Sequence, residues 1–174
     1  IDAVRALGGV AAIMASHPHM YGVQLEWARA FGAAVWISEK DRRWVRRDGP
    51  ELHSWTEPFE VLPGVRASQP GGHFPGSAVA VWSAGAEGRG VLLSGDTIAA
   101  VPAHGWVTFM RSYPNKIPLS AAVVARVSAA VGELDFDRLY DNFGGIVPSD
   151  ANGAVQRSAR RYIELVSGDH DADT

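Results

Sequence analysis

The sequence contains no cysteine. This absence excludes disulfide bonds, a cysteine nucleophile and any zinc or iron–sulfur site held by thiolates. A metal ion bound by this chain must therefore be held by histidine and carboxylate side chains. The chain offers 6 histidines and 19 aspartates and glutamates for such a site.

An excess of positive charge is also missing, because 16 Lys and Arg stand against 19 Asp and Glu, with a formal net charge of -3. No global positive field is present to hold nucleic acid or an anionic membrane, so we expect neither as a partner. The densest basic cluster, residues 42–47, has the acidic neighbours Glu39, Asp41 and Asp48. This pattern favours a solvated surface over a nucleic-acid site.

Long hydrophobic runs are absent as well. The apolar stretches 10–15 and 121–127 end well before the roughly 18–20 residues that span a bilayer, so we expect no membrane helix. No basic stretch leading into an apolar segment opens the sequence, and we expect a cytoplasmic protein.

With 174 residues, 47% of them hydrophobic, the composition is typical of one globular domain. We predict a domain at 1–166 and a disordered polar tail at 167–174.

Hydrophobic periodicity predicts that helices and strands alternate in the first part of the chain. The expected order is a helix at 1–7 ended by Gly8 and Gly9, a strand at 10–15 buried on both faces, a helix at 23–31 and a strand at 33–37. This order is typical of an α/β protein.

Gly and Pro punctuate the next part of the chain into short β-type runs, which we interpret as an antiparallel meander. The runs are 53–56, 65–68, 77–82 and 91–94. Further along, the periodicity predicts strands at 106–110 and 136–141, and helices at 119–131 and 149–165, with Ser149 as an N-cap.

Two histidines one residue apart, His17 and His19, directly follow the predicted strand 10–15. They stand at the carboxyl end of that strand, where α/β sheets tend to place ligands. Residues two apart in extended backbone point the same way, so both imidazoles can converge on one metal ion. For the pair alone, the alternative is a turn with two solvent-facing histidines.

Two further residues stand at similar positions. His73 lies in the Gly-rich loop 71–76, whose glycines allow close backbone approach. Asp96 follows the apolar strand that ends at Gly95. Three histidines and one aspartate, all at strand ends flanked by Gly or Pro, fit one convergent metal site better than they fit independent turns.

The segments 16–22, 72–77 and 93–97 together resemble the metallo-β-lactamase superfamily. The family pattern is His-x-His-x-Asp-His after a strand, an isolated His in a Gly-rich loop, a Gly-Asp after a strand, and a late His. The resemblance covers about 1–166 and implies an αββα sandwich with a metal site in a cleft along the top of two sheets. It also implies that the first metal site consists of His17, His19 and His73, supported by Asp96.

The chain departs from the family pattern at several positions. Tyr21 and Gly22 stand where the family has Asp and His, and Asp141 and Asn142 stand where the late His is expected. A second site would keep only Asp96, so the resemblance implies a single metal ion. Family members also carry strands before the helix that 1–7 resembles, so the N-terminal strands are missing or the first sheet is built differently. Exposed sheet edges would then favour a homo-oligomer.

Zinc held by three imidazoles keeps one position open for water and lowers the pKa of that water to about 7. We therefore expect a hydrolase that uses a metal-bound hydroxide on a small ester, thioester, lactone or amide. Asp96 would complete the coordination or accept a hydrogen bond from the water. Tyr21 is a hydrogen-bond donor to a developing oxyanion or, alternatively, a packing aromatic at the mouth of the cleft.

Two other functions use the same residues. His17, His73 and Asp96 match the two-His-one-carboxylate set of mononuclear non-haem Fe²⁺ enzymes, which would make the protein a dioxygenase acting on a sulfur substrate. The changed motif also fits a non-catalytic member of the superfamily that serves as a binding or scaffold protein. Outside the motifs, His104 is a weaker candidate for the cleft, and His53 is interpreted as structural.

Overall fold

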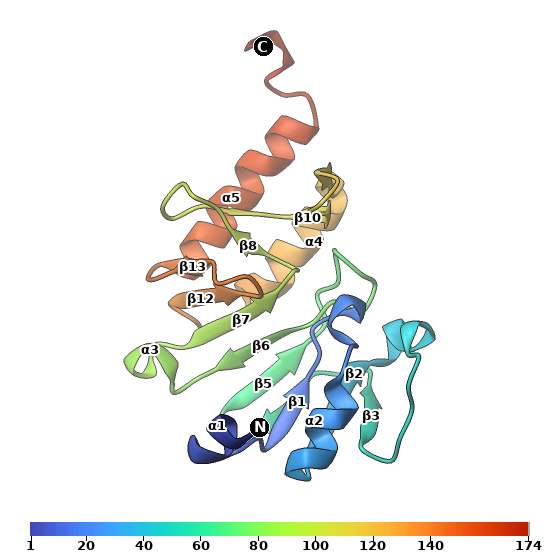
Figure 1. The fold of residues 1–174 in the computed structure, drawn as a ribbon. Helices are drawn as coiled ribbons and strands as arrows, with labels where there is room; N and C mark the ends of the chain where they lie inside the picture. Colours follow the sequence, from blue (N-terminus) through green and yellow to red (C-terminus); the bar gives the residue numbers. More distant parts are fainter. Residues whose placement is uncertain (174) are drawn as a thin grey trace.

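Two sheets form the centre of the computed structural model, which describes residues 1–173 (Figure 1). The first sheet is parallel, in the order β1-β2-β3, and the second has the order β13-β12-β7-β6-β5-β4. In the second sheet β7 and β12 pair in parallel and the other neighbours are antiparallel. The strands are β1 Ala12–Met14, β2 Ala34–Ser38, β3 Leu52–Trp55, β4 Phe59–Leu62, β5 Val65–Ser68, β6 Val79–Trp82, β7 Val91–Gly95, β12 Arg138–Asp141 and β13 Ile146–Val147.

Helices cover the outer faces of both sheets (Figure 1). Helix α2 packs on the first sheet, and α4 and α5 pack on the second. The α-helices are α1 Asp2–Ala6, α2 Gln24–Phe31, α3 Gly85–Gly88, α4 Ala121–Gly132 and α5 Ala151–Val166. Short 3-10 helices are η1 Pro18–Met20, η2 Glu39–Trp44 and η3 Asp171–Asp173, and small hairpins pair β8 Ala99–Ala100 with β9 Val107–Thr108 and β10 Met110–Ser112 with β11 Ile117–Pro118.

Apolar side chains hold these layers together. Leu25 of α2 packs with Val35 and Ile37 of β2, and Trp55 lies between the two sheets. The largest cluster joins the second sheet to α4 and α5 through Leu92 and its neighbours. The layer order is helix, sheet, sheet, helix, which confirms the αββα sandwich predicted from the sequence.

The predicted meander is wrong at its first strand. β3 pairs with β2 in parallel and belongs to the first sheet, so the antiparallel meander consists of β4, β5, β6 and β7. The connection between β2 and β3, residues 39–51, is long enough for the crossover that a parallel pair requires. Strand β4 was not predicted, although Phe59 and Val61 alternate with polar Glu60 as a half-buried strand does.

Two local predictions are corrected by the structure. Ser149 does not cap α5, because the N-cap residue is Asp150, in a left-handed conformation with φ of 51°. Instead, the backbone N–H of Asp150 donates to Oδ1 of Asp137 at 2.8 Å, and the backbone N–H of Ala151 donates to the carbonyl oxygen of Asp137 at 2.9 Å. Strand β1 is half-buried rather than buried on both faces.

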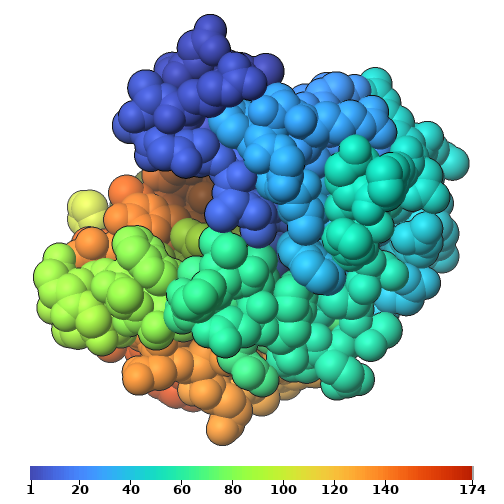
Figure 2. Space-filling view, turned by 90° about the horizontal axis from the view of Figure 1, so that it is seen from below, coloured from blue at the N-terminus to red at the C-terminus, as the bar shows by residue number. Residues whose placement is uncertain are grey.

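The reason for the exposure of β1 is that the first sheet is narrower than the second. Leu93 is 45% exposed although β7 is a central strand. A groove of about 480 Å³ lies over this face, lined by Ile13 of β1, by Leu93 and by Tyr140 of β12, among others. Figure 2 shows the hollow between the dark-blue N-terminal segment and the orange and green second sheet. The homo-oligomer expected from exposed sheet edges stays a prediction.

None of the helices in residues 1–173 is long and apolar enough to cross a membrane. The cytoplasmic location and the absence of a nucleic-acid partner stay predictions.

In the expected tail, Asp171–Asp173 form one 3-10 turn and Thr174 lies outside the described residues. The division into a domain at 1–166 and a disordered tail also stays a prediction.

The two faces of β7 provide a stability test. We expect Leu92→Ala to lower the free energy of unfolding by about 2–5 kcal/mol, because Leu92 is fully buried against the helical layer. The neighbouring Leu93→Ala should cost about 1 kcal/mol or less, since Leu93 already contacts solvent. Urea unfolding monitored by tryptophan fluorescence measures both. Equal losses would mean that the groove over Leu93 is covered in solution.

Candidate metal centre

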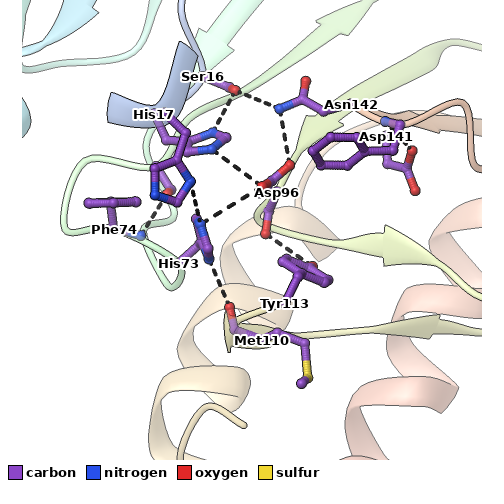
Figure 3. Close-up of polar contacts among 12 residues, drawn as sticks. Ser16, His17, His73, Phe74, Asp96, Met110, Tyr113, Asp141 and Asn142 are labelled. Carbon is purple, nitrogen blue, oxygen red and sulfur yellow. Dashed lines mark hydrogen bonds and ion pairs between the residues drawn. The ribbon is translucent and has the colours of Figure 1, made fainter. Parts of the chain in front are cut away.

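The residues with metal-binding side chains come from three connections at one edge of the two sheets (Figure 3). His17 and His19 follow β1, His73 lies between β5 and β6, and Asp96 follows β7. One ligand atom from each of these four residues lies within 4.8 Å of the other three. The structure therefore brings together the four residues that the sequence placed in a metal site.

The route by which His17 and His19 converge differs from the prediction. Only His17 is extended, with φ of -169° and ψ of 171°, and Pro18 starts the 3-10 helix η1. Alternation along a strand therefore does not align the two rings. The helical turn instead brings Nδ1 of His19 to 3.4 Å from Nε2 of His73.

Three of the distances between the candidate ligand atoms, 3.3, 3.4 and 3.8 Å, are close to those expected around a tetrahedral ion. Zinc at 2.0–2.2 Å from nitrogen and oxygen ligands would separate these atoms by about 3.3–3.6 Å. Nε2 of His17 lies 3.3 Å from Oδ2 of Asp96, and Nε2 of His73 lies 3.8 Å from the same oxygen. Nε2 of His17 is buried and has no hydrogen-bond partner among the described residues. A cation at the common point would remove the cost of burying that atom unpaired.

The outer nitrogens of two rings determine which atoms face the site. Nδ1 of His73 lies 3.1 Å from the carbonyl oxygen of Met110. A carbonyl only accepts, so Nδ1 carries the proton and Nε2 keeps its lone pair for a metal. Nδ1 of His17 lies 2.9 Å from Oγ of Ser16, and because a hydroxyl can donate or accept, this contact orients the ring without fixing its tautomer.

The electrostatic environment favours the protonation states that bind metal. Burial lowers the pKa of His73 and of His19. Burial alone would raise the pKa of Asp96, but the adjacent His17 ring and the amide of Asn142 bring it below the usual value. At neutral pH the His19 and His73 imidazoles are therefore neutral and the carboxylate is ionised, as metal binding requires.

Several supporting residues were not found from the sequence. Arg111 donates from Nη1 to the carbonyl oxygen of His73 at 2.6 Å, and its guanidinium lies 5.5 Å from the Phe74 ring centre. The Tyr113 hydroxyl donates to the backbone oxygen of Asp96 at 3.1 Å. These residues lie in a different hairpin and carry no motif of their own, so no local pattern indicates their role.

A buried carboxylate supports the His73 loop from the other side. Asp41 of η2 is fully buried, and its Oδ2 accepts a hydrogen bond from the backbone N–H of Gly76 at 3.1 Å. Burial raises the pKa of this carboxyl group. In the sequence Asp41 is visible only as an acidic neighbour of a basic cluster, because nothing local shows that it turns inward.

Tyr21 and Asn142, which stand where the resemblance leads us to expect ligands of a second metal, have different surroundings. The Tyr21 ring packs against the apolar cluster formed by α2 and the first sheet, and burial raises the pKa of its hydroxyl. A catalytic role for Tyr21 stays a prediction. Asn142, by contrast, lies beside the site and donates from Nδ2 to Oδ1 of Asp96 at 3.1 Å.

The weaker histidine candidates lie elsewhere. His53 packs on Trp36, with ring centres 4.9 Å apart. His104 lines a shallow depression with Phe143 and is exposed. Within residues 1–173, the cluster of His17, His19, His73 and Asp96 is the one group of three or more such side chains with ligand atoms close enough to share an ion.

Comparison with solved structures identifies the fold. The chain aligns with the metallo-β-lactamase SMB-1, in a complex with mercaptoacetic acid, at a TM-score of 0.62 and 17% identity, over 96% of this chain and 79% of that one. It aligns with TTHA1623 in a di-iron-bound form at 0.61 and 19%, over 90% and 80%. This chain is therefore a metallo-β-lactamase-fold protein with a histidine and aspartate cluster suited to metal binding.

Among curated proteins, the chain is similar to the uncharacterized protein YmaE of Bacillus subtilis (strain 168). The two are 46% identical over 170 residues, which is 97% of this chain. The chain spans 62% of the length of that relative. No family model matches the sequence.

The close approach of β7 to Ser16 provides a test of the site. A Cβ at Gly95 would lie 2.7 Å from Cβ of Ser16, next to the candidate ligand His17. We expect Gly95→Ala to displace this segment and weaken metal binding by at least ~10-fold, as measured with zinc by competition with a chromogenic chelator.

Gly32→Ala, at the end of α2, is the matched control. Gly95 and Gly32 both have positive φ, 57° and 67°, so alanine is strained at either position, but a Cβ at Gly32 meets nothing within 4 Å. Zinc affinity should be unchanged in this control. An equal loss of metal affinity in both variants would mean that backbone strain, and not the contact with Ser16, causes the effect.

Proposed function

We propose that this protein is a metal-dependent hydrolase that uses one zinc ion to cleave a small ester, thioester, lactone or amide. The observation that carries the proposal is the convergence of three imidazole nitrogens and one carboxylate oxygen within 4.8 Å. The likeness to SMB-1 supports a hydrolytic use of the site, because a β-lactam is a cyclic amide.

Zinc in a site of this composition supplies a nucleophile at neutral pH by lowering the pKa of water to about 7. His17, His19 and His73 would hold the ion and leave a position open for water. Asp96 would either add Oδ2 as a further ligand or accept a hydrogen bond from that water and so orient it.

The direction of substrate approach follows from burial. His17, His73 and Asp96 are 1%, 2% and 6% exposed, whereas His19 is exposed. A substrate therefore reaches the site past His19. The Phe74 ring lies edge-on to His19, with centres 4.9 Å apart, and is buried. It provides an apolar wall that limits water access to the back of the site.

Iron chemistry is the second candidate, because two similar structures contain iron. TTHA1623 was solved in a di-iron-bound form, and the chemotaxis sensor ODP, aligned at a TM-score of 0.58 and 18% identity over 91% of this chain and 70% of that one, as a peroxy diiron species. The oxygen of Asp96 lies 3.3 and 3.8 Å from the nitrogens of His17 and His73, which suits a two-His-one-carboxylate iron site. Such a protein would use dioxygen to oxidise a sulfur substrate.

Metal analysis of protein purified without chelators separates these functions. We expect about one zinc per chain and hydrolysis of at least one member of a panel of nitrophenyl esters, thioesters, lactones and β-lactams. Iron with oxygen consumption on a persulfide would favour the dioxygenase. The absence of both zinc and iron, even after attempted reconstitution, would favour a binding or scaffold protein.

Replacing one ligand tests the assignment of the site. His73→Ala should lower zinc affinity at least ~100-fold and hydrolysis at least ~1,000-fold, because the ion loses one of its three imidazole ligands and with it the contact to the loop. The matched control is His53→Ala, a histidine outside the site. Metal content and activity of this control should equal those of the wild type. Unchanged zinc binding in His73→Ala would contradict the proposed site.

A further inference from the structure

Asn142 lies in the loop after β12 and joins two other loops of the site. Both donor contacts come from its side-chain nitrogen, Nδ2, which lies 3.1 Å from Oδ1 of Asp96 and 3.3 Å from Oγ of Ser16 (Figure 3). An amide nitrogen carries two hydrogens. Both donors of Asn142 are therefore directed at residues that hold or border the proposed metal position.

The contact with Asp96 divides the roles of the two carboxylate oxygens. Oδ1 accepts the hydrogen bond from Asn142, whereas Oδ2 lies 3.3 and 3.8 Å from the ligand nitrogens of His17 and His73. One oxygen is thus directed at the first metal position and the other is occupied by an N–H donor. A second cation on Oδ1 would have to displace that donor.

The contact with Ser16 extends to His17. For Nε2 of His17 to bind a metal, Nδ1 must carry the proton and donate it to Oγ of Ser16, which lies 2.9 Å away. A hydroxyl oxygen has two lone pairs, so Ser16 can accept from His17 and from Asn142 together. Asn142 therefore orients Asp96 directly and His17 through Ser16.

Few other side chains near Oδ1 are available to a second ion. The carboxylate of Asp141 is used by the backbone, because Oδ1 accepts from Phe143 and Gly145 at 2.8 and 2.7 Å and Oδ2 accepts from Ala100 at 3.1 Å. Gly22 has no side chain, and Tyr21 packs on the first sheet. Asn142 is thus the side chain that decides what contacts Oδ1 of Asp96.

We propose that Asn142 is a positioning residue that limits this site to one metal ion and strengthens the binding of that ion. Its amide occupies the second oxygen of Asp96 and holds Oδ2 and His17 in their binding orientations. This inference rests on the proposed metal binding. Asn142 is exposed, so it can be replaced without disturbing the core.

Zinc titration of Asn142 variants tests the proposal. Asn142→Leu keeps the approximate size and removes both donors, so it should bind one zinc about 10–100-fold more weakly than the wild type. Asn142→His replaces the donor with an imidazole nitrogen next to a free Oδ1, so it should bind a second, weaker equivalent of zinc. Asn115→Leu is the matched control. Asn115 is also exposed, and its side-chain nitrogen donates to Oγ of Ser112 at 3.0 Å rather than to a candidate ligand.

Cobalt substitution provides a readout that a loss of stability alone would not change. The visible absorption of bound Co²⁺ reports ligand number and geometry, so Asn142→Leu should alter the spectrum at one equivalent, and Asn142→His should add a second component between one and two equivalents. Wild-type affinity in Asn142→Leu, or one equivalent only in Asn142→His, would overturn the proposal. A wild type that binds no metal would instead overturn the proposed function.

Discussion

The rest of the site depends on the convergence of four ligand atoms whose charges and lone pairs all require a cation. The nitrogens of His17 and His73 and the ionised oxygen of Asp96 are buried beside the exposed His19, and such groups are costly to bury together without a cation. Each of the three buried residues also has a hydrogen-bonding partner outside the cluster. Ser16 contacts His17, the Met110 carbonyl contacts His73, and Asn142 contacts Asp96. Such outer contacts fix ring orientation and raise metal affinity.

The sandwich positions these groups by bringing distant connections to one edge. The second sheet packs on its helices and contributes His73 and Asp96 from the ends of its strands, while the first sheet contributes His17 and His19 after β1. Gly95 allows the two sheets to approach closely at this edge, because a side chain there would collide with Ser16. The groove over Leu93 lies behind this contact, so the site is formed although the first sheet covers only part of the second.

The chain aligns about equally well with SMB-1, a metallo-β-lactamase, and with TTHA1623 in a di-iron-bound form, at TM-scores of 0.62 and 0.61. Fold alone therefore does not determine the metal or the reaction. In this chain the amide of Asn142 contacts the carboxylate of Asp96. The side chains around the candidate site, rather than the fold, are therefore where the chemistry has to be tested.

The sequence by itself determined an α/β protein, most helices and strands, and the four candidate ligands, because hydrophobic periodicity and His, Gly and Asp at strand ends are local patterns. The αββα sandwich followed from the resemblance of its motifs to a known family. It did not show that β3 joins the first sheet, since strand pairing depends on contacts far along the chain. Only the tertiary structure decided that η1 turns His19 toward His73, and that Asp41, Arg111 and Asn142 support the ligands. Each of these contacts joins residues more than 30 positions apart, and no local pattern encodes such a distance.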